Sequence, residues 1–217
     1  MAAIRRVEAV TDYILVGGGG LAREVLDWFA PALEGSGSGF AGYIDDGEDP
    51  MAAFGHRLRH VGPIRGFKPA PGQELVMAIG APAGKRALAE RLTAAGARFA
   101  TLIHPKAWVS ASARIDAGAV IGPFAHVSAD AHIGELVMQC ALAGVVHDAI
   151  AGAGCSISAY VDLMGGVKAG GGCLFGSGAR VLPRLTVGER CVIGAGAVVV
   201  RNVPDDTTMY AAPARRL

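Results

Sequence analysis

The chain has 217 residues and a formal net charge of +1, and its length suits one or two domains. Such a balanced charge provides neither a basic stripe for nucleic acid nor an acidic tail, so we expect no nucleic-acid partner. No long apolar segment precedes residue 17, and we therefore expect neither a signal peptide nor a membrane span. The four cysteines form no CxxC pair, which argues against a zinc or disulfide framework and favours the cytoplasm.

The first hundred residues alternate between strand and helix patterns. An apolar run at 13–16 ends in four glycines, Gly17 to Gly20, and apolar residues then recur at helical spacing. A second strand is predicted at 40–44, and the Gly- and Pro-rich stretch 47–73 holds at most one short strand near Ile64. A strand at 75–79, a helix at 83–95 and a strand at 99–103 follow. This order predicts a small Rossmann-like parallel sheet, which we assign to a domain of residues 1–102.

The glycine run is compatible with the pattern G-x-G-x-x-A, and an acidic pair, Asp45 and Asp46, follows about 23 positions later. Glycines let a phosphate approach the backbone, the helix N-terminus adds N–H donors, and an acidic residue after the second strand often binds a ribose or base. The alternative is a tight strand-to-helix turn beside a solvated acidic loop. A complete NAD-binding domain is disfavoured because only about 90 residues precede the repeats described next.

Residues 103–203 repeat with a period of six. Fourteen of the seventeen residues at the first position, from Ile103 to Val199, are large and apolar, and Gln139 is one of the three exceptions. All seventeen residues at the fifth position, from Ala107 to Val203, are Ala, Val, Cys or Leu. In each hexad, two inward positions on either side of one outward residue form a short strand, and the residues that follow form a bend. Three such strands and three bends close one coil of 18 residues. The period of six excludes an amphipathic helix.

This pattern resembles the hexapeptide signature of the left-handed parallel β-helix, and the handedness follows from that resemblance alone. We assign it to a second domain of residues 103–217, with the coils ending near Pro204 and the tail from Ala212 leaving the stack. Glycine is frequent at the second position, and we expect it to supply backbone freedom where the chain turns. Cys155, Cys173 and Cys191 are 18 residues apart and are expected to stack inside the coils as small apolar fillers.

One histidine stands out from the other five. His147 is the third residue of its hexad, in a bend, and Asp148 follows it, so both side chains can lie outside the coil together. An imidazole that a carboxylate orients is a suitable general base, and the alternative is an ordinary surface histidine. A three-histidine zinc site is disfavoured because no two of His126, His132 and His147 are 18 residues apart.

The glycine pair Gly165-Gly166 occupies the same bend as His147, one coil further on. Small residues there would leave backbone N–H groups open beside the imidazole. Such donors could stabilise the oxyanion that forms when a thioester carbonyl is attacked.

Nearly the whole chain resembles the bacterial acetyltransferases of nucleotide-linked amino sugars, a group with bacillosamine-pathway and perosamine N-acetyltransferases and sialic acid O-acetyltransferases. The stretches that carry the resemblance are GGGGLAREVLDWF, GYIDD, AIGAPAGKR, LIHPKAWVSASARI, VVHDAIAGAG, MGGVKAGGG, VLPRLTVG and APAR. The resemblance implies a homotrimer with acetyl-CoA, the co-substrate, in the groove between neighbouring coils. We expect no metal, because the spacing of the histidines disfavours a zinc site.

The resemblance also implies the site residues. The catalytic base falls on His147, and the acidic residue that raises its basicity falls on Asp148. The nucleotide-sugar site falls on Gly19, Gly20, Leu21, Asp45, Asp46 and Gly80, and the acetyl-CoA contacts fall on Ser156, Gly165, Ser177 and Ala195. Two positions depart from the family pattern, because Leu21 and Ser156 stand where the family usually has histidine.

The sequence thus predicts a cytoplasmic, acetyl-CoA-dependent N-acetyltransferase that acts on the amino group of a nucleotide-linked deoxysugar, with His147 as the base. O-acetylation of a sugar hydroxyl is the nearest alternative. A nucleotide-sugar-binding protein with weakened catalysis is a further alternative, which Leu21 and Ser156 motivate. The sugar, the nucleotide and the acyl chain stay open at this point.

Overall fold

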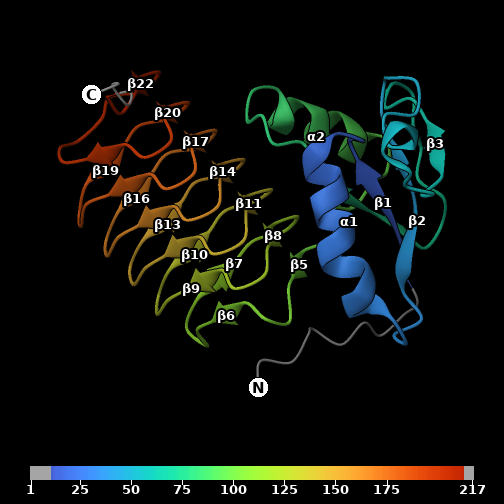
Figure 1. The fold of residues 1–217 in the computed structure, drawn as a ribbon, viewed down its shortest axis with the longest axis horizontal. Helices are drawn as coiled ribbons and strands as arrows, with labels where there is room; N and C mark the ends of the chain where they lie inside the picture. The colour runs from blue at the N-terminus through green and yellow to red at the C-terminus, as the bar shows by residue number, and fades with distance from the viewer. Residues whose placement is uncertain (1–10, 213–217) are drawn as a thin grey trace, which may run out of the picture.

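A computed structural model describes residues 11–212 of the chain, which begins with a parallel sheet and continues as a stack of coils (Figure 1). The sheet has four strands, β1 (Asp12–Val16), β2 (Gly39–Ile44), β3 (His60–Gly62) and β4 (Gln73–Met77), in the order β3-β2-β1-β4. The helical segments are α1 (Gly20–Leu33), α2 (Lys85–Ala94) and the 3₁₀ turn η1 (Ala52–Phe54). The short strand that was predicted near Ile64 lies slightly earlier, at β3.

The two α-helices pack against opposite faces of this sheet. Along β1, Tyr13 and Leu15 belong to the apolar cluster of α1, whereas Ile14 and Val16 belong to the cluster of α2. This alternation follows from the two-residue period of a strand, and both faces are apolar because both are covered. The C-terminal ends of β1, β2 and β4 therefore meet at one edge of a sheet that is protected on both sides.

The coils contain three parallel sheets, so each coil has three sides. The first sheet consists of β5 (Leu102–Ile103), β8 (Val120–Ile121), β11 (Met138–Gln139), β14 (Ser156–Ile157), β17 (Leu174–Phe175), β20 (Val192–Ile193) and β22 (Thr208–Met209). The second consists of β6 (Trp108–Val109), β9 (His126–Val127), β12 (Gly144–Val145), β15 (Asp162–Leu163), β18 (Arg180–Val181) and β21 (Val198–Val199). The third consists of β7 (Arg114–Ile115), β10 (His132–Ile133), β13 (Ile150–Ala151), β16 (Lys168–Ala169) and β19 (Thr186–Val187).

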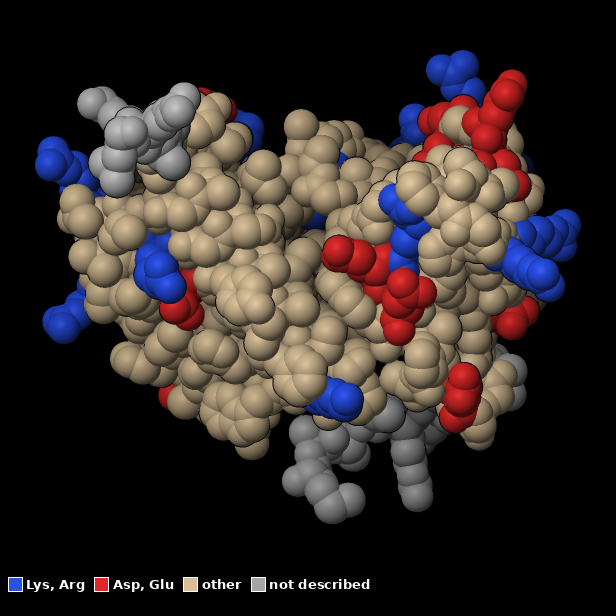
Figure 2. Space-filling model, in the orientation of Figure 1, with Lys and Arg blue, Asp and Glu red and all other residues tan. Residues whose placement is uncertain are grey.

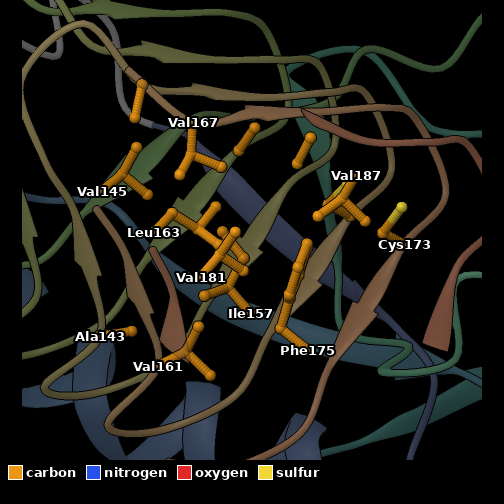
Figure 3. Packing of buried hydrophobic residues seen from close by; sticks show 14 of the residues in the cluster. Ala143, Val145, Ile157, Val161, Leu163, Val167, Cys173, Phe175, Val181 and Val187 are labelled. Carbon is orange, nitrogen blue, oxygen red and sulfur yellow. The ribbon is translucent and has the colours of Figure 1, made fainter. Parts of the chain in front are cut away.

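Strand partners differ by 18 residues from the first coil to β21, as the hexads predict. The inward first and fifth positions form one continuous apolar core along the axis, part of which Figure 3 shows around Phe175, Leu163 and Val181. Cys155, Cys173 and Cys191 are buried free thiols within it. Gln139 is buried as well, and its amide donates to the carbonyl oxygens of His126 and Ala143.

We expected the glycines at the second position to supply backbone freedom where the chain turns, and this explanation was wrong. The left-handed backbone falls at the fourth position of the hexads, where non-glycine residues such as Phe124 and Tyr160 also adopt it. The second-position glycines are required by packing between coils, because a Cβ on Gly176 would lie 2.5 Å from the backbone nitrogen of Ala195. The sequence did not reveal this, since the close contact is made with the next coil.

The N-terminal sheet and the first coils share one apolar cluster, in which α1 lies between them (Figure 1). Val25 and Phe29 of α1 pack in this cluster with Val120 and Met138, which point outward from the coils. The strand that was predicted at 99–103 is divided: Phe99 forms a bridge to Leu75, and β5 pairs with β8 in the first coil.

The coils continue past Pro204, where the sequence predicted their end. Val203 forms a bridge to Val187, and β22 pairs with β20 at an offset of 16 residues, from Val192 to Thr208. The predicted departure of the tail concerns 212–215, most of which lies outside the described residues. Within residues 11–212, none of the helices has the length and hydropathy needed to cross a bilayer.

Candidate active site

His147 and Asp148 lie together in the bend that joins β12 to β13. His147 Nδ1 is 2.8 Å from Asp148 Oδ2, and the two side chains are 64% and 66% exposed. Asp148 has a φ of 60°, a left-handed conformation that aspartate tolerates and that brings its carboxylate beside the ring. With Nδ1–H donated to the carboxylate, Nε2 is the nitrogen that can accept a proton.

Gly165 lies directly beside the imidazole. A Cβ at this position would be 2.5 Å from His147 Cε1 and 2.6 Å from Nε2, so only glycine leaves room for this ring position. The expectation of two open N–H groups is wrong for one of them, because the N–H of Gly166 donates to the carbonyl of His147 at 2.9 Å. The N–H of Gly165 has no hydrogen-bond partner within residues 11–212, so it is the donor available to an oxyanion.

The glycine turn connects β1 to α1 and has distinct roles for its members. Gly17 has a φ of 104°, and Gly18 is packed so tightly that a Cβ would lie 2.6 Å from Pro50 Cγ. The N–H of Gly18 donates to Asp45 Oδ2 at 2.7 Å. In contrast, the N–H groups of Gly19, Gly20 and Leu21 have no partner among the described residues, and they lie at the N-terminus of α1. This end of the helix can therefore bind an anionic group.

Asp45 and Asp46 follow β2, and both stabilise nearby backbone. Asp45 Oδ1 also accepts the N–H of Gly47 at 2.8 Å, and Asp46 Oδ1 accepts the N–H of Ile64 at 2.9 Å. Each carboxylate keeps further lone pairs for a ligand. Gly80 follows β4 and is adjacent to Leu21, since a Cβ on Gly80 would lie 3.4 Å from Leu21 Cδ2. The predicted nucleotide-sugar residues are thus brought to one edge of the sheet.

Sequence reasoning missed two aromatic groups beside Asp45. The ring of His60 stacks on Tyr43 with a centroid separation of 4.9 Å, and His60 Nε2 is 3.1 Å from the Asp45 carbonyl oxygen. The Tyr43 hydroxyl donates to Asp49. Burial, together with this bond, raises the pKa of Tyr43 to about 12. The alternating apolar pattern of β2 could have indicated Tyr43 as a core residue, but nothing in the sequence indicates the stack.

A cavity of about 320 Å³ lies near this edge, where Asp46, Ile79, Lys85 and Arg91 are among its lining residues. Lys85, the first residue of α2, is 1% exposed and was also missed by sequence reasoning. Its Nζ donates to Ser156 Oγ at 2.8 Å and is 3.4 Å from the carbonyl oxygen of Cys155.

The four predicted acetyl-CoA contacts lie at different places on the coils. Ser156 points out of the coil as predicted, but it is only 4% exposed because α2 covers it. Ser177 and Ala195 are exposed on one bend, where the N–H of Gly196 donates to the carbonyl of Ser177 in the preceding coil. Gly165 belongs to the bend of His147. Within residues 11–212, no group of three or more His, Cys, Asp and Glu side chains is arranged to hold a metal ion.

The two halves of the candidate site lie on different sides of one chain. The N-terminal sheet and helices pack against the face of β5, β8, β11 and β14. His147 lies in a bend between the other two sheets, opposite that face. Figure 2 shows the surface hollowed between the coils and the N-terminal part. Within one chain, the structure therefore does not bring His147 to the glycine turn.

Comparison with solved structures identifies relatives that match the chain along its length. PerB from Caulobacter crescentus, in complex with CoA and GDP-perosamine, is 31% identical with a TM-score of 0.77, and the match covers 92% of this chain and 94% of that one. The chain belongs to the bacterial nucleotide-sugar acetyltransferase family of hexapeptide-repeat proteins. The acetyltransferase domain of PglB from Neisseria gonorrhoeae, in complex with acetyl coenzyme A, is 29% identical with a TM-score of 0.82, and the match covers 96% and 100% of the chains.

Membership of this nucleotide-sugar acetyltransferase family rests on structure, since no protein-family model and no curated protein matches the chain. WeeI from Acinetobacter baumannii, 20% identical with a TM-score of 0.67 over 96% and 100% of the chains, shares the fold. Perosamine N-acetyltransferase has also been solved with one histidine replaced by asparagine and by alanine, both with CoA and GDP-perosamine.

Proposed function

We propose that the protein transfers the acetyl group of acetyl-CoA to the amino group of a nucleotide-linked amino-deoxysugar. The observation that carries this proposal is the arrangement of His147, Asp148 and Gly165, a paired imidazole beside an open backbone N–H. The family relatives that bind CoA with GDP-perosamine, or acetyl coenzyme A, support the same substrates for this chain.

The residues suit the individual steps of this reaction. The amine nitrogen attacks the thioester carbonyl carbon, and His147 Nε2 takes the proton that the amine loses, while Asp148 holds Nδ1–H. The carbonyl oxygen becomes an oxyanion that the Gly165 N–H can bind. When the C–S bond breaks, the amide forms, and the CoA thiolate leaves with the proton that His147 returns.

We propose that the acceptor binds at the edge of the N-terminal sheet. Its diphosphate lies over the free N–H groups of Gly19, Gly20 and Leu21, its base or ribose meets Asp45 and Asp46, and Gly80 lines the approach. Acetyl-CoA extends from Gly165 along Ser177 and Ala195. Ser156, which the resemblance also assigns to acetyl-CoA, is covered by α2 within one chain, where its hydroxyl oxygen accepts a hydrogen bond from Lys85.

We propose a homotrimer, because one chain places His147 opposite its own nucleotide-sugar residues. A neighbour would supply the missing half. An apolar ridge on one bend of the coils is suited to such contact. It consists of three exposed side chains spaced 18 residues apart, Phe124 (57% exposed), Leu142 (42%) and Tyr160 (61%).

The proposal includes a Rossmann-like domain of residues 1–102 and a left-handed β-helix of residues 103–217. We also propose that the protein is located in the cytoplasm, because its cysteines are free thiols and its co-substrate would be acetyl-CoA.

The direct test is incubation with acetyl-CoA, a thiol reagent and a panel of UDP-, GDP- and dTDP-linked amino sugars. Release of CoA thiol together with a product heavier by one acetyl group supports the proposal. Transfer to sugars that carry only hydroxyl groups would favour O-acetylation. Tight binding of a nucleotide sugar without turnover by any member of the panel would favour a binding protein.

A further inference from the structure

The cavity of about 320 Å³ adjoins the glycine turn over which the diphosphate is proposed to lie. Ile79 lines the cavity, and a Cβ on Gly17 would lie 3.1 Å from Ile79 Cγ1, so one wall packs against the turn. Asp46 also lines it and directly follows Asp45, which accepts the N–H of Gly18. A nucleotide whose diphosphate lies at this turn can therefore place its base in the cavity.

The walls of this cavity are largely apolar. Ile64 from the loop after β3, Ile79 from the end of β4 and Leu88 of α2 line it. Its volume is at the lower end of the range of about 300–1,000 Å³ that is typical of ligand pockets. Such a site suits one flat ring system, whose faces are apolar and whose polar groups lie on its edge, better than a whole nucleotide sugar.

Two groups of opposite charge line the same cavity without pairing. Asp46 Oδ1 accepts the N–H of Ile64 at 2.9 Å and that of Arg65 at 3.3 Å, and these bonds fix the carboxylate. Asp46 Oδ2 and the guanidinium of Arg91 have no hydrogen-bond or ion-pair partner within residues 11–212. The cavity therefore offers a ligand one group that only accepts and one group that only donates.

These two groups distinguish between the nucleobases. Guanine alone presents two adjacent donors, N1–H and N2–H₂, next to two acceptors, O6 and N7. A carboxylate can accept both donors, and a guanidinium can donate to both acceptors. Uracil and thymine have a carbonyl oxygen on each side of N3–H, and a carboxylate repels both oxygens. Adenine and cytosine place the lone pair of a ring nitrogen beside their amino group.

We propose that the acceptor is a guanine nucleotide sugar, whose base lies in this cavity with N1–H and N2–H₂ donated to Asp46 and with O6 and N7 accepting from Arg91. This inference rests on the proposed function, and it names the nucleotide that the proposed function leaves open. Arg91 is then a specificity-determining residue of the acceptor site. Sequence reasoning missed it because its place beside Asp46 depends on how α2 packs on the sheet.

Calorimetry with free nucleoside diphosphates tests the base without catalysis. The wild-type protein should bind GDP about tenfold or more tightly than UDP, dTDP and ADP, since one good bidentate contact to a base discriminates by about 10–100-fold. IDP lacks the N2 amino group and should bind about threefold or more weakly than GDP, as for the loss of one hydrogen bond. Binding of UDP, dTDP or ADP as tight as that of GDP overturns the proposal, and so does equal affinity for GDP and IDP.

Variants assign the two contacts. Asp46→Asn should remove the preference for GDP over IDP, because its oxygen can keep the N–H of Ile64 while its NH₂ group meets the donors of guanine. Arg91→Met should remove the preference for GDP over 7-deaza-GDP, which lacks the N7 acceptor. Arg86→Met is the matched control, since Arg86 carries the same charge on α2 but packs beside Gly154 of the coils. An Arg91→Met protein that binds GDP as tightly as the control overturns the proposal.

The inference and the proposed function fail separately. Tight binding of GDP that depends on Asp46, by a protein that acetylates no sugar, would contradict the function and retain the guanine site. Acetylation of a UDP- or dTDP-linked amino sugar in preference to its GDP-linked counterpart would support the function and overturn the guanine site. The comparison of GDP, IDP and UDP on the wild-type protein remains decisive if a variant fails to fold.

Discussion

The Cα of Gly165 lies beside the ring of His147 one coil earlier, at a place where a Cβ would be 2.5 Å from His147 Cε1. Gly165→Ala should displace the imidazole and lower kcat by on the order of 10–100-fold, because a general base acts only from a defined position. Gly171→Ala is the matched control: it lies at the same hexad position on another bend, where the nearest atom to a Cβ is 3.2 Å away. Steady-state kinetics and circular dichroism of both variants check this, and equal kcat values in the two would disprove it.

His147→Ala should lower kcat by on the order of 10²–10⁴, the contribution of a general base. The fold should remain intact because the side chain is 64% exposed and supports no core. His132→Ala serves as the control, since this histidine pairs with Asp116 on another face of the coils. Turnover of the His147 variant close to that of the control would remove His147 from the mechanism.

Asp148→Asn should separate the charge of this residue from its conformation. Asparagine tolerates the left-handed backbone at φ 60°, so the bend should be preserved, while the ring loses its anionic partner. We expect kcat to fall by about tenfold or more with KM values nearly unchanged. An Asp148→Asn enzyme with wild-type kcat would show that the 2.8 Å contact with His147 has no catalytic role.

The sequence predicted the coils well because each inward residue repeats a local rule, and a period of six leaves little choice of register. It placed His147 beside Gly165 for the same reason, since the two are 18 residues apart. It failed where distant segments meet. The burial of Lys85 against Ser156 depends on how α2 packs on the coils, and no local pattern encodes that packing. The reason for Gly176 was likewise missed, because the close atom belongs to the following coil.

The buried charge of Lys85 should also appear in the stability of the protein. Its pKa falls from an ordinary 10.5 to about 8 in the folded chain, so the unfolded chain binds more protons between these values. Stability should therefore rise with pH from about 8 to about 10.5, and the full cost of burying the charge applies below pH 8. Lys85→Met should be more stable than wild type at pH 7 by about 2–3 kcal/mol, and the difference should shrink as pH rises. Urea unfolding at several pH values measures both, and a difference that does not change with pH would contradict this expectation.

Asp46→Asn should raise KM for the nucleotide sugar far more than KM for acetyl-CoA. The amide keeps an oxygen that can accept the N–H of Ile64, so the loop should remain in place while the charge is lost. Glu48→Gln in the same loop controls for the change of net charge. Equal effects on the two KM values would place the nucleotide elsewhere.

The opposite placement of His147 and the nucleotide-sugar residues leads to a test with two defective proteins. If a neighbouring copy supplies the base, chains with His147→Ala and chains with Asp46→Asn can complement each other. The two variants are unfolded together, refolded as a mixture and assayed at a low concentration of nucleotide sugar. About a quarter of the sites in a random mixture then combine an intact His147 with an intact Asp46 from the neighbour, so activity should exceed the sum of the separately refolded variants. Light scattering should give three chains per particle. Activity equal to that sum, or a fully active monomer, would show that each chain holds a complete site.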